Sequence, residues 1–266
     1  MRKPLIAYSL KDNTSVSIAN KLFDIIDFEE IEPQNGMRRF KSDSAEAIEL
    51  EGEHIFADFL TNYSADYIVF LSKHFSSKGI ASFTTHAEGN WSSVADLGGK
   101  PHELSIASPD NMLKLLKQLN KYNHYGINVT YEATHHGPLL AIPSLFVEVG
   151  GNEAAISSEN IVEVIANSVA DLLLGTAETH YNKVAIGIGS THYPRKFSLL
   201  ALEKDYAFSH IMPRYYSSEI SMLEQALNRS SIRAEIGVIE WKSINSEERN
   251  NIIKELENLG IDYERI

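Results

Sequence analysis

Cysteine is absent from this sequence of 266 residues. Disulfide bonds and thiolate chemistry are therefore excluded, and any metal site must be built from histidine, aspartate or glutamate. No apolar run approaches the roughly 18 residues that a membrane-spanning helix needs. The first apolar stretch, residues 4–9, is too short for a signal peptide, and Lys11 and Asp12 follow it. We therefore expect a cytoplasmic protein with no membrane partner.

Positive charge is scarce. Lys and Arg number 24 against 36 Asp and Glu, which gives a formal net charge of -12. This balance argues against a general nucleic-acid-binding protein but is compatible with a local basic patch. The candidates for such a patch are Lys73, Lys78, Lys100, Lys183, Arg195, Lys196 and Arg214. The alternative is that these residues are scattered surface charges.

The chain alternates between strand patterns and helix patterns, and it contains no repeat, low-complexity tract or flexible linker. Continuous apolar runs such as "YIVFL" (67–71) are typical of strands that are covered on both faces. The expected strands are residues 4–9, 46–51, 67–72, 82–87, 127–132, 145–149, 183–188, 206–211 and 234–240. This alternation predicts an α/β layer fold, which we expect to form a single catalytic domain over residues 1–266.

Helices are expected between these strands, over residues 14–26, 108–122, 158–174, 217–230 and 246–260. Thr14 or Ser15 is the expected cap of the first helix, and Gly175 the expected terminator of the third. Two segments lack periodicity and are predicted to be loop excursions, near residues 31–45 and 88–106.

Six of the ten histidines lie at or just after the carboxyl ends of expected strands. They are His74, His86, His135, His136, His192 and His210, and three glutamates, Glu88, Glu132 and Glu148, lie near them in the sequence. Ligands of α/β sheets bind at this edge, so these side chains converge if the strands are parallel. For any single histidine, a hydrogen-bonded structural role is the alternative. The other four histidines, His54, His102, His124 and His180, are assigned to the surface.

The segment "YEATHHGP" (131–138) concentrates the strongest candidates for metal binding or proton transfer. No helical H-E-x-x-H motif is present. The approach to Gly137 and Pro138 indicates an extended or turning segment, in which His135 and His136 point to opposite sides. A nucleophilic serine is disfavoured because the chain has no G-x-S-x-G motif, and "GIGSTH" (187–192) lacks the third glycine of a dinucleotide-binding loop.

Five longer motifs together resemble the archaeal and plant type of D-aminoacyl-tRNA deacylase. They are "SKHFSSKGIASFTTHAEGNW" (72–91), "YEATHHGP" (131–138), "VEVGG" (147–151), "GIGSTHYPRKF" (187–197) and "DYAFSHIMPRY" (205–215). One departure is visible: where the family pattern has Gly-Gly-Thr-His-Tyr, this chain has Ser190 in place of the second glycine. The substitution is small and casts little doubt on the activity.

The resemblance implies a zinc-dependent, monomeric, cytoplasmic enzyme that hydrolyses the ester between a D-amino acid and the 3′ end of tRNA. It implies a three-layer α/β/α fold of the phosphorylase/hydrolase-like type, with a mixed, mostly parallel sheet similar to that of bacterial-type peptidyl-tRNA hydrolase. Its partner would be the acceptor end of D-aminoacyl-tRNA.

Candidate roles follow from the clustering and the matched motifs together. The catalytic candidates are His136, Glu132 and His192, with His136 or Glu132 as the base. The metal candidates for Zn²⁺ are His86, Glu88, His135 and His210. The substrate-binding candidates are His74, Glu148, Trp91, Tyr193, Arg195, Lys196 and Arg214. Glu148 or Glu132 would hold the α-ammonium group. Phe75, Trp91 and Tyr193 would wall the site or stack on the terminal adenine, and the basic residues would contact phosphates.

Other functions remain open at this stage. A metal-dependent peptidase or a nucleoside phosphorylase-like enzyme would share the fold, and a module that binds RNA ends would share the basic residues. Peptidyl-tRNA hydrolysis is a further alternative. For Phe75, Trp91 and Tyr193, core packing is the alternative to substrate contact.

Overall fold

The computed structural model describes residues 2–75, 81–151, 158–178 and 180–266. The first half of the chain contains β1 (Lys3–Ser9), α1 (Asn13–Ile25), β2 (Glu29–Gln34), β3 (Met37–Lys41), β4 (Glu46–Leu50), η1 (His54–Phe56), η2 (Asp58–Asn62), β5 (Ala65–Phe75), β6 (Ser82–His86), β7 (Ile106–Ala107), α2 (Pro109–Tyr122) and β8 (Asn128–Tyr131). The second half contains β9 (Pro143–Gly151), α4 (Glu159–Leu173), β10 (Lys183–Ile188), α5 (Arg195–Lys204), β11 (Tyr206–Met212), η3 (Arg214–Tyr216), η4 (Ile220–Met222), α6 (Leu223–Asn228), β12 (Ile236–Ile239), η5 (Trp241–Ser243), α7 (Ser246–Asn258) and β13 (Asp262–Arg265).

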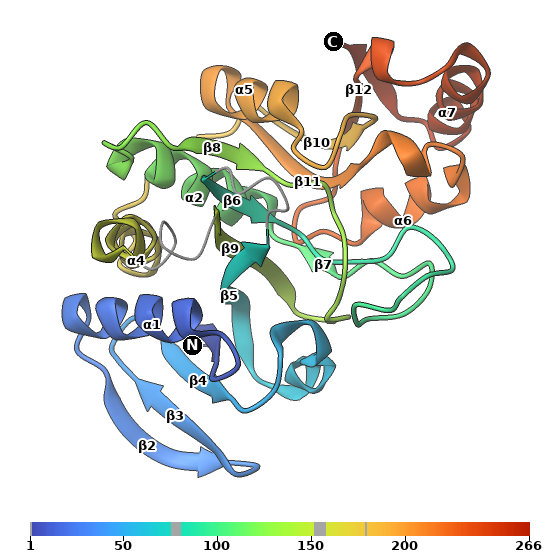
Figure 1. Ribbon diagram of the computed structural model, residues 1–266. Coiled ribbons are helices and arrows are strands. Elements are labelled where there is room, and N and C mark those ends of the chain that lie inside the picture. The colour runs from blue at the N-terminus through green and yellow to red at the C-terminus, as the bar shows by residue number, and fades with distance from the viewer. Residues whose placement is uncertain (1, 76–80, 152–157, 179) are drawn as a thin grey trace.

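The strands form two sheets (Figure 1). The larger sheet has the order β2-β3-β4-β1-β5-β9-β6-β8, with β7 paired to β9. Its centre, β4-β1-β5-β9, is parallel, while β6 runs antiparallel to β9. The smaller sheet, β11-β10-β12-β13, is parallel throughout. A mixed, mostly parallel α/β fold is thus confirmed.

One hydrophobic core joins the two sheets. It includes Ile6 of β1 and Leu22 of α1, and it continues to Leu116 of α2 and to Ile186 and Val238 of the smaller sheet. A second, smaller core lies on the other face of β1, β4 and β5, and the short η2 helix contributes Leu60 to it. The larger sheet is therefore covered on both faces, as its continuous apolar runs predict.

All nine expected strands are present, but the excursion near residues 31–45 is not a loop. It contains the hairpin β2–β3, whose turn residues Asn35 and Gly36 both have positive φ, +54° and +82°. An Asn-Gly turn between two strands is a hairpin signal. The alternation was obscured because β2 lies at the sheet edge and its residues are exposed or half-buried. Strand β13 and helix α5 were not expected either.

The helix ends differ in detail from the expectation. The cap of α1 is Asp12, whose carboxylate accepts the N–H groups of Thr14 and Ser15, and neither of those residues caps the helix. The helix expected over 217–230 shortens to η4 and α6. Among the described residues no helix is long and apolar enough to cross a membrane.

Candidate active site

Strand ends from both sheets bring seven ionisable side chains together. His74 is the second-to-last residue of β5, His86 ends β6, and Glu148 lies on β9 between them, paired in register with Ser72 and Thr84. The segment after β8 carries Glu132, His135 and His136, and His192 follows β10. Two backbone hydrogen bonds attach this segment to the smaller sheet, from Ala133 N–H to the His192 carbonyl and from Thr134 N–H to the Ile211 carbonyl, both 2.9 Å long. The site therefore lies where the two sheets meet.

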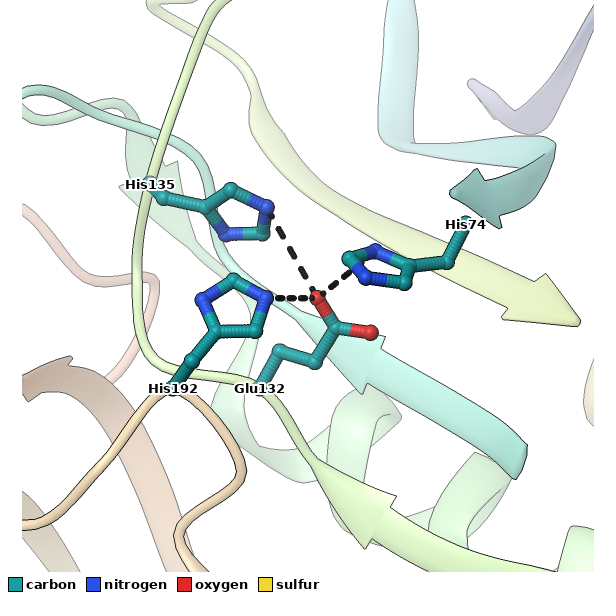
Figure 2. A group of neighbouring side chains, drawn as sticks. All are labelled: His74, Glu132, His135 and His192. Atoms are coloured by element: carbon teal, nitrogen blue, oxygen red, sulfur yellow. Dashed lines mark ion pairs between the residues drawn. The ribbon is translucent and has the colours of Figure 1, made fainter. Parts of the chain in front are cut away.

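Glu132 lies at the centre of this group (Figure 2). Its Oε2 atom is 2.9 Å from His192 Nε2, 3.2 Å from His74 Nδ1 and 3.6 Å from His135 Nε2. Its side chain is fully buried, whereas that of His192 is 29% exposed. A buried carboxylate thus orients imidazoles that come from three separate parts of the chain, and His192 is the one most open to solvent.

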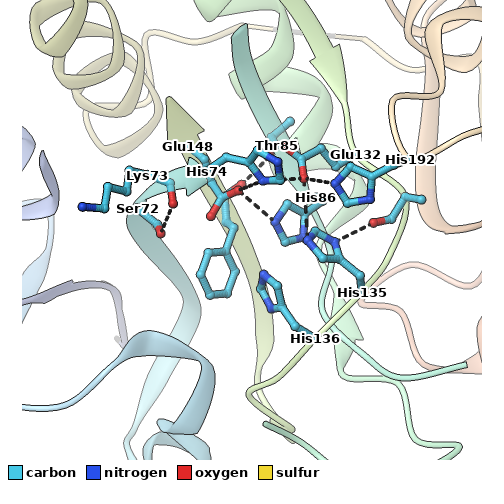
Figure 3. A network of polar contacts seen from close by, with 12 residues as sticks. Ser72, Lys73, His74, Thr85, His86, Glu132, His135, His136, Glu148 and His192 are labelled. Atoms are coloured by element: carbon cyan, nitrogen blue, oxygen red, sulfur yellow. Dashed lines mark hydrogen bonds and ion pairs between the residues drawn. The ribbon is translucent and has the colours of Figure 1, made fainter. Parts of the chain in front are cut away.

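Glu148 forms a second carboxylate centre beside the first (Figure 3). Its Oε2 atom lies 3.5 Å from His74 Nδ1 and 3.5 Å from His86 Nε2. His74 is therefore shared between Glu132 and Glu148, and the two centres form one continuous network.

Three imidazoles, His86, His135 and His136, form what we call the histidine trio. The His135 and His136 ring centroids are 4.2 Å apart, and those of His86 and His135 are 4.5 Å apart. Each Nδ1 atom contacts a backbone carbonyl oxygen, that of Ala87, Ala133 or Gly137 respectively. Ligating histidines commonly donate the other ring N–H to a carbonyl in this way, which leaves Nε2 free for a metal.

The donor set of the trio fits a metal ion. Ligand atoms of His86, His135 and His136 lie within 4.8 Å of one another, and so do those of the group His74, Glu132, His135 and His192 and of the group His86, Glu132 and Glu148. Within the described part of the chain, His86 Nε2 and Glu132 Oε1 are buried and form no hydrogen bond. Buried polar atoms normally have a partner, and a bound cation would provide one here.

Adjacent histidines were expected to point to opposite sides of the chain, and that prediction is wrong. His136 has a φ of +43°, so the backbone turns at this residue instead of continuing as a strand. The turn directs both rings into the same group, as their short centroid distance requires. The two-residue alternation holds only for an extended backbone.

Burial and ion pairing set the protonation states of the network. Burial lowers the pKa of His74, but the carboxylates of Glu132 and Glu148 outweigh burial and raise this pKa to about 10. Burial raises the pKa of Glu132, yet hydrogen bonds from His192 and His74 hold that pKa well below its ordinary value. Burial lowers the pKa of His136 to about 4 and also lowers that of His135, which His136 and His86 depress further. His135 and His136 are therefore neutral near pH 7, the state that binds metals.

Two cavities meet at His135 and His136. One, of about 450 Å³, is also lined by Asp12, Glu148 and His192. The other, of about 410 Å³, is lined by apolar and aromatic groups that include Trp91, Val94, Leu97 and Tyr216. Leu97, His135 and His136 line both cavities. The imidazole pair thus lies between a more charged cavity and a more apolar one.

Two of the expected metal ligands are not part of the metal-binding groups of the described residues. Glu88 is fully buried, accepts a hydrogen bond from Ser144 Oγ at 3.0 Å, and has a pKa that burial raises to about 7. His210 is fully buried, with Nδ1 3.2 Å from Thr134 Oγ1 and Nε2 2.8 Å from the Arg229 carbonyl oxygen. Both ring nitrogens of His210 are engaged, so this histidine has the structural role that was weighed as the alternative.

Of the expected substrate-binding residues, His74 and Glu148 belong to the carboxylate–imidazole network, and the others lie in the core, beside the network or at the surface. Trp91 is only 1% exposed and donates from its indole N–H to the Thr134 carbonyl, so it supports the apolar cavity from the core. The Tyr193 ring lies 5.7 Å from that of His74 and 5.1 Å from that of His192. Arg195, Lys196 and Arg214 are exposed, and Lys196 pairs with Glu240 at 3.3 Å. Of the other basic candidates, Lys78 is outside the described residues.

Some residues of the site were not predicted. Phe146 stacks on His86 at a centroid distance of 5.2 Å and meets His136 edge-on, but in the sequence it is one of many apolar strand residues. His54, assigned to the surface, is instead 5% exposed, lines the charged cavity, and lies 3.2 Å from Ser15 Oγ. No local signal distinguishes it, because its burial depends on the packing of η1 against β5 and β9.

Comparisons with known proteins are consistent across the chain. A sequence model described as D-aminoacyl-tRNA deacylase matches residues 61–264. The Pyrococcus furiosus protein of that name is 36% identical over 263 residues, covering 95% of this chain and 96% of its own length. The Thermococcus kodakarensis protein of the same name is 33% identical over 264 residues, covering 96% of each chain. A crystal structure of a conserved protein of unknown function matches with a TM-score of 0.91 at 29% identity, covering 99% of this chain and 95% of that one.

Proposed function

The chain belongs to the D-aminoacyl-tRNA deacylase family, and from this premise we propose how its residues hydrolyse the ester between a D-amino acid and the 3′ end of tRNA. The observation that carries the proposal is the Glu132 centre, where one buried carboxylate oxygen lies within 3.6 Å of three imidazole nitrogens beside an open cavity. Ester hydrolysis needs a positioned water, a base and a group that stabilises negative charge on the carbonyl oxygen.

We assign His192 as the general base. When Nε2 donates to Glu132 Oε2, Nδ1 is the nitrogen left to accept a proton from water, and Glu132 stabilises the resulting imidazolium. The partial exposure of His192 allows water to reach it. His74, held by both carboxylates, is the candidate for stabilising the charge that develops on the ester carbonyl oxygen.

The histidine trio is our candidate for the metal site. His86, His135 and His136 would hold Zn²⁺ through their Nε2 atoms, with Nδ1 fixed by backbone carbonyls. A bound zinc ion supplies Lewis acidity toward the ester carbonyl and toward water. This assignment replaces Glu88 and His210 with His136 and moves His136 from the role of base to that of ligand.

The two cavities suit the two halves of the substrate. We propose that the charged cavity receives the aminoacyl group, with Glu148 near its α-ammonium, and that the apolar cavity receives the terminal adenosine beside Tyr216. An L-amino acid would direct its ammonium away from the carboxylate, and an unpaired buried charge costs several kcal/mol. Arg195 and Arg214, both exposed, would contact phosphates of the acceptor stem.

Deacylation of D-Tyr-tRNA and L-Tyr-tRNA tests this function. The wild-type protein is expected to hydrolyse the D-ester and spare the L-ester. Glu132→Gln and His192→Ala should each lower kcat by about 10²-fold or more, the usual contribution of a general base. Glu178→Gln removes one exposed carboxylate and is the control. Equal activity on both esters, or near-native turnover in both site variants, would refute the assignment.

Metal binding is tested without using activity. Zinc bound at about 1,000 times its dissociation constant would stabilise the fold by about 4 kcal/mol, so chelation should lower Tm and added zinc should restore it. His135→Ala should bind no zinc by elemental analysis and show no chelation-dependent shift. His124→Ala, which removes an exposed histidine, should behave as wild type. An unchanged Tm and zinc content in His135→Ala would place the metal elsewhere.

We also propose that the chain works as a monomeric single domain in the cytoplasm. The main core, which joins both sheets, supports one cooperative unit. One unfolding transition and a monomer mass by light scattering are expected, and two resolved transitions or a dimer mass would contradict this.

A further inference from the structure

A third cavity, of basic character, lies far from the histidines of the active site. Its volume is about 600 Å³, and its wall includes Arg2, Lys3, Arg39 and Lys41, together with Glu46 and Tyr63. Its lining includes Lys3 at the start of β1 and Ala65 at the start of β5, whereas the active site lies at the other end of β5. From Ala65 to His74 a strand rises by roughly 30 Å, which separates the two sites by about that distance.

Strand pairing puts three of these cations, Lys3, Arg39 and Lys41, on one face of the sheet, and Arg2 immediately precedes β1. Glu46 of β4 pairs with Leu5 of β1 on one side and with Lys41 of β3 on the other. Side chains alternate along a strand, so Arg39 and Lys3 share this face with Lys41. The intervening positions face the main core, as the burial of Phe40 in that core shows. The cluster is thus built by the fold of the β2–β3 excursion.

Four cations and one carboxylate are among the residues that line this cavity, and a further carboxylate, that of Glu29, belongs to the residue paired with Lys41 on β2. Glu46 is the one carboxylate among the lining residues, and it accepts from Arg39 Nη2 at 2.6 Å. Lys3 Nζ donates to the Ser42 carbonyl oxygen at 2.6 Å, a contact that leaves its charge unbalanced. Among the described residues Arg2 and Lys41 form no ion pair. Such a concentration stands out in a chain of net charge -12.

We propose that this basic cavity binds a backbone phosphate of the tRNA body while the acceptor end occupies the active site. The proposal rests on the proposed function, since only a substrate that extends well beyond its reacting end can reach both places. Lysine and arginine side chains donate hydrogen bonds to phosphate oxygens. Such contacts fix the position of the nucleic acid on the protein without recognising its base sequence. On a protein whose net charge repels a polyanion, a cavity whose lining has an excess of cations is where the polyanion can bind.

The variant Arg2→Gln, Lys41→Gln tests the basic cavity. Both side chains are exposed, so the fold should be preserved. The control, Lys242→Gln, Lys254→Gln, removes two exposed cations from η5 and α7 and changes the net charge equally. Two substrates are compared: full-length D-Tyr-tRNA and a D-tyrosyl oligonucleotide that carries only the 3′ end.

We expect the cavity variant to raise KM for full-length tRNA by about five- to tenfold at unchanged kcat, and to leave the short substrate unaffected. The slope of log affinity against log salt for deacylated tRNA should decrease by about 1 to 2, one unit per lost phosphate contact. Equal effects in the control variant, or an equal effect on the short substrate, would overturn the proposal.

Two further measurements test which ligand the basic cavity binds, independently of whether the protein deacylates tRNA. If calorimetry with inorganic phosphate detects binding that the variant loses, while its tRNA affinity is unchanged, the cavity binds a free small anion and the tRNA proposal is wrong. Filter binding of deacylated tRNA needs no catalysis. If the cavity variant loses affinity for deacylated tRNA, the tRNA-binding role of the basic cavity is supported even if no deacylation is observed. If the variant deacylates normally and its affinity is unchanged, that role is refuted and the proposed function is unaffected.

Discussion

Among the described residues, five with side chains have a positive φ, and two of these, His136 and Ser190, lie at the site. His136 has a φ of +43° and Ser190 a φ of +98°. Strained conformations of this kind persist where the surrounding structure enforces them, and they are concentrated at functional sites. At His136 the turn directs a ring into the histidine trio. Ser190 precedes Thr191 and His192, and its N–H donates to Ser243 Oγ at 3.0 Å, so its conformation positions the proposed base.

Ser190→Gly should therefore stabilise the protein. Glycine adopts a φ near +98° without the steric cost that a Cβ atom imposes, and we expect a gain of about 0.5–1 kcal/mol in the free energy of unfolding. Denaturant unfolding measures the change, and deacylation should stay within about twofold because the N–H bond to Ser243 is retained. A loss of stability would mean that the serine hydroxyl contributes more than the strain costs.

His210 predicts a pH dependence of stability. Burial lowers its pKa to about 4, from an ordinary value of 6.5. The unfolded state therefore binds a proton at higher pH than the folded state does, so the stabilisation is complete above pH 6.5 and is lost as the pH falls toward 4. The loss is up to about 3 kcal/mol. His210→Gln should be less stable at pH 7 and show a shallower decline between these values. Parallel curves for the two proteins would contradict this.

The long loop between β6 and β7 is anchored to η1 at a glycine. A Cβ atom on Gly98, whose φ is +82°, would lie 1.8 Å from the Ile55 carbonyl oxygen. Leu97, the preceding residue, lines both active-site cavities, and its carbonyl accepts the Gly137 N–H at 2.9 Å. The packing of this loop thus helps to shape the site at the turn after His136.

Gly98→Ala and Gly36→Ala form a matched pair, because both glycines have a φ of +82° but only Gly98 has a close neighbour. The strain common to both should cost about 1 kcal/mol, and that is all we expect for Gly36→Ala. Gly98→Ala must also displace the loop, so it should be at least 2 kcal/mol less stable than wild type and impaired in kcat/KM. Equal stabilities of the two variants would show that the loop can move away from the added Cβ atom without a loss of stability.

Helix and strand positions were largely predictable because their signals are local. Pro109 at the start of α2 and Gly175 after α4 act through φ and hydrogen bonding within a few residues. The misses are elements with weak local patterns. β13 reads as "DYER" and is stabilised by pairing with β12, and β2 is a polar edge strand. Whether such segments form strands depends on their pairing with other strands in the tertiary structure.

At the scale of the whole molecule, charge is distributed unevenly. The exposed cations Arg195 and Arg214 lie beside the site, the basic cavity lies at the far edge of the larger sheet, and the net charge is -12. Binding of a polyanion should therefore depend on local clusters and be strongly weakened by salt.

The double variant Arg195→Ala, Lys196→Ala should flatten the salt dependence of tRNA binding by about one unit of slope. Arg195 is expected to contribute most, because Lys196 is paired with Glu240. These residues lie near the reacting end, so KM should rise for the short D-tyrosyl oligonucleotide as well as for full-length tRNA, unlike in the basic-cavity variant. Salt-insensitive binding of the wild type would refute the role of both clusters.

The sequence alone determined the fold class, nine of the thirteen strands that the structure describes, the five motifs that identify the family, and the set of histidines and glutamates from which the site is built. These features depend on residue type and on spacing over short distances. Only the tertiary structure decided which of those side chains meet. Glu132 lies at the centre of the site, and Glu88 and His210 lie outside the groups that could bind a metal. The two sheets and the backbone turn at His136 set the directions of the side chains. The basic cavity likewise exists only through the pairing of β1, β3 and β4, which brings together cations that are nearly 40 residues apart in the chain.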